Sequence, residues 1–191
     1  MVIAAAHEKM LAPRKILWST PSQVQEVLVE WIELKPGDVV CDVGCGDGRV
    51  LIHWAIHASK CKEMLPVKFV GIEIQEERVK EAEELIAKAR SNGSIVPEVS
   101  TEVICGNALD HHDVYSKATI MFLYLIPRGL RLLKPILLES IRHCDKNVKI
   151  ITYMSAFPDE VPVEKRLCGV DHQPGAAWPI FLYEFGSSLA P

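Results

Sequence analysis

The sequence predicts an α/β fold in which a seven-stranded, mostly parallel sheet ends in an antiparallel hairpin and carries helices on both faces. Three observations predict it. Up to Tyr153, short apolar runs alternate with helical stretches, which is the pattern of parallel strands joined by helices. The first run breaks into alternating glycines, Gly44, Gly46 and Gly48, and restarts as a helix. After Tyr153, two apolar runs flank a turn that leaves no room for a helix, which indicates antiparallel pairing.

The first helix is predicted after Ser19-Thr20-Pro21-Ser22, where a hydroxyl residue caps the helix and Pro21 takes its first position. The segment Lys35–Asp38 ends it, and an apolar strand from Val39 then leads to the acidic Asp42. The apolar face of the helix is formed by residues at helical spacing: Val24, Val27, Leu28, Trp31 and Ile32.

The second strand, residues 67–74, contains Glu73 near its end, and a third strand leads to Asn107. Between them a helix is predicted from Glu76 to Arg90, ended by the turn-forming residues 91–94. Its predicted buried stripe is Val79, Ala82, Leu85, Ile86 and Ala89.

A fourth strand, Ala118 to Leu125, has the unbroken apolar character of a fully buried parallel strand. Pro127 and Pro135 then predict a broken helical region, with a second helix from Pro135 to His143, because proline deep inside a helix removes a hydrogen bond. The last predicted strands are 148–153, 162–170 and 179–185.

The stretch Asp42-Val43-Gly44-Cys45-Gly46-Asp47-Gly48 predicts a ligand that lies against the backbone, since glycine allows a tight turn without a Cβ. In a dinucleotide-binding G-x-G-x-x-G the third glycine would stand at Arg49, but here it stands at Gly48. The carboxylates of Asp42 and Asp47 would repel a pyrophosphate and attract a cation. S-adenosylmethionine, a sulfonium that carries an ammonium group, is a ligand of that kind.

The same stretch resembles the first motif of the class I S-adenosylmethionine-dependent methyltransferases, whose sheet is Rossmann-like and seven-stranded. Glu73 stands where this family places an acid that accepts hydrogen bonds from the ribose hydroxyls. Asn107 stands where the family usually has Asp on the adenine amino group, and the amide keeps an acceptor oxygen. The cofactor-binding residues that the resemblance implies are Thr20, Asp42, Gly44, Cys45, Gly46, Asp47, Glu73, Ile74, Asn107 and Ala108.

The sequence predicts no metal site. His53 and His57 have a helical spacing that suits a metal, but no third ligand accompanies them, so a solvated helix flank is the favoured interpretation. The segment Asp110-His111-His112-Asp113 is interpreted as a polar loop or helix cap beside the cofactor.

The end of the fourth strand, Tyr124-Leu125-Ile126-Pro127, narrows the choice of acceptor. It lacks the Asn/Asp-Pro-Pro-aromatic tetrad of N6-adenine and N4-cytosine methyltransferases. Together with Ser19-Thr20-Pro21 and the glycine loop, it resembles a small group that includes mitochondrial lysine methyltransferases of the ATP synthase c subunit and the adenine nucleotide translocase. That resemblance implies a protein lysine as acceptor, with Tyr124 orienting the amine.

Two alternatives remain open: a small-molecule N- or O-methyltransferase that shares the cofactor half, and a non-catalytic S-adenosylmethionine-binding module. A nicotinamide-dependent oxidoreductase is disfavoured by the early third glycine and by the antiparallel ending.

Length and composition set the remaining expectations. The 191 residues fit one domain, residues 19–191, after an N-terminal extension of residues 1–18. The net charge of −4 gives no electrostatic signature of nucleic-acid binding, and no apolar stretch has the length of a membrane span. Six cysteines without a C-x-x-C pair indicate free thiols in a reducing compartment. We therefore expect a cytoplasmic protein, with mitochondria as the alternative.

Overall fold

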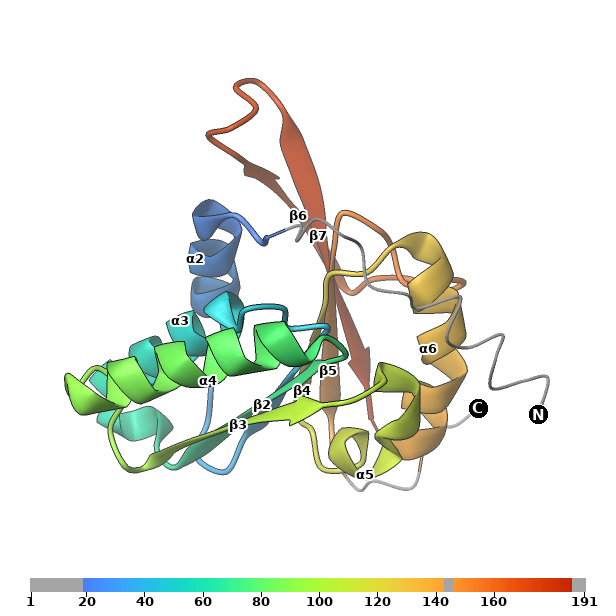
Figure 1. Ribbon diagram of the computed structural model, residues 1–191. Coiled ribbons are helices and arrows are strands. Elements are labelled where there is room, and N and C mark those ends of the chain that lie inside the picture. Colours follow the sequence, from blue (N-terminus) through green and yellow to red (C-terminus); the bar gives the residue numbers. More distant parts are fainter. Residues whose placement is uncertain (1–18, 143–145, 187–191) are drawn as a thin grey trace.

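The computed structural model describes residues 19–142 and 146–186, and these form a single seven-stranded sheet with helices on both faces (Figure 1). The strand order is β3-β2-β1-β4-β5-β7-β6. The first five strands are parallel, and β7 runs antiparallel to both β5 and β6. This confirms the predicted fold. The expected extension, residues 1–18, lies outside the described residues.

The strands are β1 (Val39–Val43), β2 (Val67–Glu73), β3 (Val99–Cys105), β4 (Ile120–Leu123), β5 (Val148–Tyr153), β6 (Glu164–Gly169) and β7 (Ala177–Phe185). The helices are α2 (Ser22–Trp31), α3 (Arg49–Lys60), α4 (Glu76–Ser91), α5 (His112–Tyr115) and α6 (Pro127–Ile141), with the 3₁₀ turns η1 (Lys62–Met64) and η2 (Ala108–Asp110). Every predicted strand is present, although β4 is shorter than the predicted 118–125.

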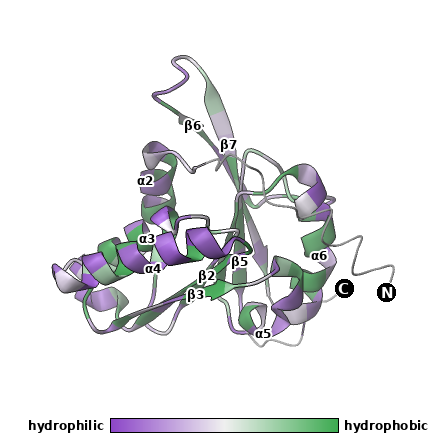
Figure 2. Ribbon diagram, viewed as in Figure 1, coloured by the Kyte–Doolittle hydropathy of each residue, from purple (hydrophilic) through white to green (hydrophobic). Residues whose placement is uncertain are grey.

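Two hydrophobic clusters fill the space between sheet and helices. One joins the sheet to α2, α3 and α4, and includes Leu28 and Trp54. The other joins the opposite face to α5 and α6, and includes Tyr115 and Leu137. Figure 2 shows the division in polarity, with hydrophobic strands inside and a hydrophilic outer surface on α4. Within the described ranges, no helix combines the length and apolarity that a membrane span requires.

The predicted break at Pro135 is wrong, because α6 runs without interruption from Pro127 to Ile141 with Pro135 inside it. Proline inside a helix costs about 3 kcal/mol. Against this cost, the helix fully buries Leu130, Leu133 and Leu137, each worth roughly 1.5–3 kcal/mol. Tertiary packing therefore outweighs the local penalty. The predicted end of the helix at His143 lies outside the described residues.

Two local predictions about helices also need correction. Pro21 occupies the N-cap position of α2 instead of its first turn, and among the described residues no side chain caps the helix. The carbonyl of Pro21 accepts from the N–H groups of Val24 and Gln25, each at 3.1 Å. On α4, Leu85 is 44% exposed, because the helix buries only the narrower stripe of Val79, Ala82, Ile86 and Ala89.

The parallel register brings the predicted site residues to one edge of the sheet. Val43 at the end of β1 pairs with Ile72 of β2 on one side and with Leu123 of β4 on the other. Glu73 pairs with Cys105 at the end of β3. The segments that follow all four strands therefore emerge next to one another, where open α/β sheets bind ligands.

Candidate cofactor and active site

The glycine loop between β1 and α3 has left-handed backbone at each of its glycines, with φ values of 78°, 57° and 73° at Gly44, Gly46 and Gly48. Only glycine adopts such angles without strain. The N–H groups of Gly44 and Cys45 donate to the carbonyl of Ile72 at 2.8 and 3.0 Å, which fastens the loop to β2. The predicted glycine turn is therefore a rigid feature of the sheet edge.

Cys45 has a packing function in this loop. Its side chain is buried, and a Cβ added to Gly71 of β2 would lie 2.7 Å from its Sγ. The thiol thus fills the space over the strand that Gly71 leaves open. Burial, followed by the charge of Asp42, raises the pKa of Cys45 well above its usual value, so the group stays neutral. Among the described residues, all cysteines are free thiols.

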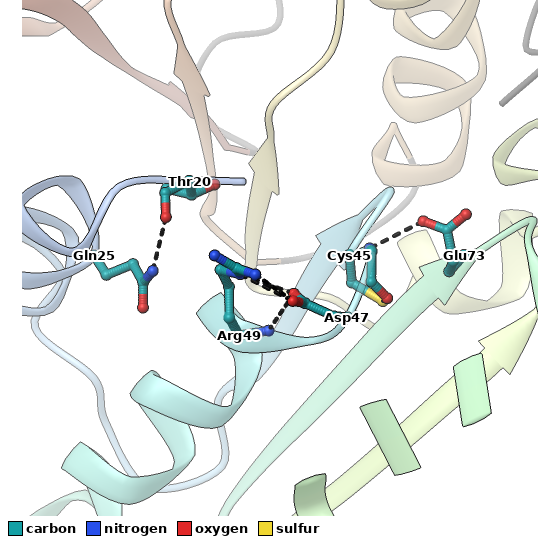
Figure 3. Close-up of polar contacts among 7 residues, drawn as sticks. Thr20, Gln25, Cys45, Asp47, Arg49 and Glu73 are labelled. Carbon is teal, nitrogen blue, oxygen red and sulfur yellow. Dashed lines mark hydrogen bonds and ion pairs between the residues drawn. The ribbon is translucent and has the colours of Figure 1, made fainter. Parts of the chain in front are cut away.

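Glu73 connects the second strand to the glycine loop (Figure 3). Its Oε2 accepts from the backbone N–H of Gly46 at 2.9 Å, and its Oε1 accepts from Gln75 N–H at the same distance. The residue is only 7% exposed. A carboxylate has about four lone-pair sites, so two such bonds leave acceptor capacity on both oxygens. Glu73 therefore orders the loop and keeps the ability to hold a pair of hydroxyls.

Asp42 is a buried carboxylate, only 3% exposed. Its Oδ2 is buried and has no hydrogen-bond partner within the described part of the chain. Burial first, then the nearby charges of Glu73 and Asp47, raises the pKa of Asp42 to about 7. An orphaned acceptor beside two other carboxylates is a position that a positive charge would stabilise. The site therefore fits the ammonium and sulfonium groups of S-adenosylmethionine.

Asp47, in contrast, already has a cationic partner. The guanidinium of Arg49 donates from Nε to Asp47 Oδ1 at 2.9 Å and to Oδ2 at 3.1 Å, and Nη2 also contacts Oδ2 (Figure 3). Partial burial disfavours the charged carboxylate, but the hydrogen bonds and charge of Arg49 outweigh it and lower the pKa of Asp47. Of the two loop carboxylates predicted from the sequence, only Asp47 has a cationic partner among the described residues.

Replacing Asp42 by asparagine should stabilise the fold at neutral pH. The pKa of Asp42 is about 7 in the folded chain and about 4 when unfolded. Between these values the folded state retains a proton that the unfolded state releases, so the free energy of unfolding falls as pH rises from about 4 to about 7. In Asp42→Asn this fall should disappear. The Tm at pH 8 should then rise by about 2–4 °C for each kcal/mol by which the substitution raises the free energy of unfolding.

Thermal unfolding of both proteins from pH 4 to pH 8 measures this effect, with Glu84→Gln on the exposed face of α4 as the control for charge. Cofactor affinity should change in the opposite direction. It should rise with pH through about 7 in the wild-type chain, as Asp42 becomes charged, and should be low and pH-independent in the variant. Parallel stability curves for wild type and variant would contradict the assignment.

The residues that the sequence predicts at the adenine side of the cofactor follow β2 and β3. Asn107 caps the turn η2, since its Oδ1 accepts from Leu109 N–H at 3.1 Å. One lone pair of the oxygen and both amide protons remain for a ligand. Ile74 is exposed, and the carbonyl of Ala108 accepts from the hydroxyl of Tyr115. Thr20 is buried in the segment before α2, where its carbonyl accepts from Gln25 Nε2 at 2.8 Å.

Tyr124 lies directly after β4, one residue beyond the Leu123 that pairs with Val43. Its ring stacks at a tilt against Tyr153 at the end of β5, with ring centroids 4.8 Å apart. Its hydroxyl donates to Met154 Sδ at 3.2 Å. The loop after β4 lies against the glycine loop. The side chain of Leu125 is so near Gly44 that a Cβ added to this glycine would lie 3.3 Å from Leu125 Cδ2. The aromatic pair therefore borders the predicted cofactor site.

Sequence reasoning did not single out Tyr153, Met154 or Arg49 as site residues. Tyr153 ends the predicted fifth strand. Because the fourth and fifth strands are neighbours in the sheet, its position could have indicated that it lies beside Tyr124. Met154 carries an unusual φ of 67°, which no sequence pattern indicates. Such backbone costs about 1–3 kcal/mol and is held here by a hydrogen bond from Met154 N–H to the carbonyl of Pro179 at 2.8 Å.

In the described part of the chain, no three His, Cys, Asp or Glu side chains gather as metal ligands.

Comparison with known proteins agrees with this geometry. A family model described as a methyltransferase domain matches residues 34–121. A protein-lysine N-methyltransferase of Saccharolobus islandicus is 32% identical over 123 residues, which cover 64% of this chain and 68% of the relative.

Solved structures share the fold. An RNA methyltransferase of Salinibacter ruber, in complex with S-adenosylhomocysteine, superposes with a TM-score of 0.68 at 23% identity over 90% of this chain and 96% of its own. The C-terminal domain of precorrin-6Y C5,15-methyltransferase of Rhodobacter capsulatus gives 0.54 at 14% identity, over 87% and 90% of the two chains. At these sequence identities the similarity shows a shared fold and does not extend to a shared substrate. Taken with the matching family model and the Saccharolobus relative, the fold and its glycine loop show that this chain belongs to the class I S-adenosylmethionine-dependent methyltransferases.

Proposed function

We propose that this methyltransferase acts on the side-chain amine of a lysine in a protein. The observation that carries the proposal is the Tyr124–Tyr153 pair beside the glycine loop. Aromatic ring faces attract ammonium and methylammonium groups, and they pack against the aliphatic part of a lysine. The name of the Saccharolobus relative supports a protein lysine as acceptor. The absence of the Asn/Asp-Pro-Pro-aromatic tetrad from the sequence is a further argument against a nucleobase amine.

On the cofactor side, the proposal assigns the ribose hydroxyls to Glu73 and the adenine edge to Asn107, with Ile74 and Ala108 beside them. Asp42 faces the positive charges, and the backbone of Gly44 and Gly46 lies against the ligand. Thr20 and Cys45 border the site. These assignments rest on the orphaned acceptor of Asp42 and the lone pairs that Glu73 retains.

On the acceptor side, the chain has to present an amine with a free lone pair. S-adenosylmethionine supplies an electrophilic methyl group. An ammonium ion cannot attack it, so the target lysine must first lose a proton, and desolvation of the amine beside the aromatic pair would lower the lysine pKa. Tyr124 and Tyr153 then orient the amine, and catalysis consists of positioning and desolvation. The rate should therefore rise toward alkaline pH as the target deprotonates.

Replacing Glu73 by glutamine tests the ribose assignment. Glutamine keeps one oxygen for Gly46 N–H, whereas alanine would leave two backbone donors unpaired. The affinity for S-adenosylmethionine should fall by about 1.5–3 kcal/mol, the range for a hydrogen bond to a charged group. Calorimetry measures this loss of affinity, with Glu102→Gln, an exposed side chain on β3, as the matched control. A folded Glu73→Gln protein with wild-type affinity would place the ribose elsewhere.

The acceptor is tested by incubating the pure protein with methyl-labelled S-adenosylmethionine and a cell extract from a strain that lacks the gene. We expect a labelled protein band that yields methyl-lysine on acid hydrolysis. The Gly44→Val variant serves as the control for cofactor binding. Label in nucleic acid or in a small molecule, without a labelled protein, would refute the lysine proposal and leave the methyltransferase assignment intact.

A further inference from the structure

Arg49 is a cation beside a loop at which the other charged side chains described above are carboxylates. It is the first residue of α3 and follows the glycine loop directly, and its side chain is 42% exposed. Around the loop, Asp42, Asp47 and Glu73 contribute three acidic groups, and the first of these feels the charge of the other two. Figure 3 shows the guanidinium beside the loop, on the side on which Thr20 lies.

The contacts of Arg49 use only one edge of its guanidinium. Nε and Nη2 hold the carboxylate of Asp47 in a fork. Nη1 has no partner among residues 19–142 and 146–186. A guanidinium has five N–H donors in a fixed plane and forms paired bonds to a carboxylate along either edge. The edge formed by Nη1 and Nη2 therefore remains for a second carboxylate.

The methionine part of the cofactor needs such a cation. It carries an ammonium group and a carboxylate on the same carbon. Asp42 and its acidic neighbours suit the ammonium and the sulfonium, but they repel the carboxylate. A bidentate arginine is the side chain that best matches a carboxylate.

We propose that Arg49 binds the carboxylate of the cofactor's methionine moiety along its Nη1–Nη2 edge, while Asp47 holds the guanidinium in place from the Nε side. Arg49 thus determines specificity for a cofactor with an intact amino acid, and Asp47 is a positioning residue. The inference concerns cofactor binding alone and does not depend on lysine as the acceptor.

The test compares two probes, S-adenosylhomocysteine and its decarboxylated analogue, by calorimetry and without any acceptor. The wild-type chain should prefer the carboxylated probe by about 10- to 100-fold, the range of a charge-assisted bidentate contact. In Arg49→Gln this preference should shrink to about threefold or less, and Arg49→Lys should retain part of it. Arg131→Gln, an exposed arginine on α6, is the matched control and should keep the full preference.

Asp47→Asn separates positioning from direct contact. It should weaken the carboxylated probe more than the decarboxylated one and leave a reduced preference, since Arg49 remains present without the carboxylate that orients it. Circular dichroism and Tm verify that each variant is folded. An undiminished preference in folded Arg49→Gln would overturn the proposal. If the preference is lost as expected while extracts show no labelled lysine, the inference stands and only the proposed acceptor fails.

Discussion

Replacing Gly44 by valine should abolish the binding of S-adenosylmethionine. Gly44 has a φ of 78°, a conformation that costs a residue with a Cβ about 1–2 kcal/mol. The added Cβ would lie 3.3 Å from Leu125 Cδ2, and the two methyl groups beyond it would add bulk to the backbone surface on which we propose that the cofactor lies. The variant therefore loses both the shape of the loop and the surface against which the ligand lies.

Gly93→Val is the matched control for this experiment. Gly93 has nearly the same φ, 77°, with open space around the position of a Cβ. It follows the carboxyl end of α4, at the edge of the sheet away from the glycine loop. We expect Gly93→Val to lose stability through its φ alone and Gly44→Val to lose at least as much, measured as Tm, with loss of binding in Gly44→Val alone. Normal calorimetric binding by Gly44→Val would mean that the ligand lies elsewhere.

Replacing Tyr124 by alanine should lower turnover by about 10- to 100-fold, the cost of misplacing one reactant, with cofactor affinity within about twofold of wild type. The ring contacts Tyr153 and its hydroxyl donates to Met154, so the side chain is held at the end of β4. Its removal takes away one wall of the proposed amine channel. Tyr124→Phe keeps the ring and should fall between wild type and Tyr124→Ala.

Steady-state kinetics with a labelled protein substrate measures turnover, and calorimetry measures cofactor affinity, so the two effects are distinguished. Tyr183→Phe is the control, because it removes a buried hydroxyl that accepts from Phe157 N–H at 2.8 Å in the other hydrophobic cluster. It should lower Tm and leave turnover of the folded enzyme unchanged. Equal loss of turnover in Tyr183→Phe and Tyr124→Ala would assign Tyr124 to structure.

By itself the sequence determined the order and type of the strands, the glycine loop and the acid at the end of β2. These features depend on local patterns: glycines at alternate positions, apolar runs of strand length, and a hairpin too tight for a helix. The parallel pairing then brings Gly44, Glu73 and Tyr124 to one edge of the sheet. A local pattern therefore predicted which residues meet, because parallel strands end at a common edge.

Only the tertiary structure decided whether α6 continues through its proline and which loop carboxylate has a cationic partner. The uninterrupted helix through Pro135 exists because three buried leucines offset the cost of proline, which no local rule includes. Likewise, the two loop carboxylates look equivalent in the sequence. In the folded chain Asp47 forms an ion pair with Arg49, while the buried Oδ2 of Asp42 has no hydrogen-bond partner among the residues that the structure describes. Burial and the distance between charged groups set these differences, and both depend on contacts between distant parts of the chain.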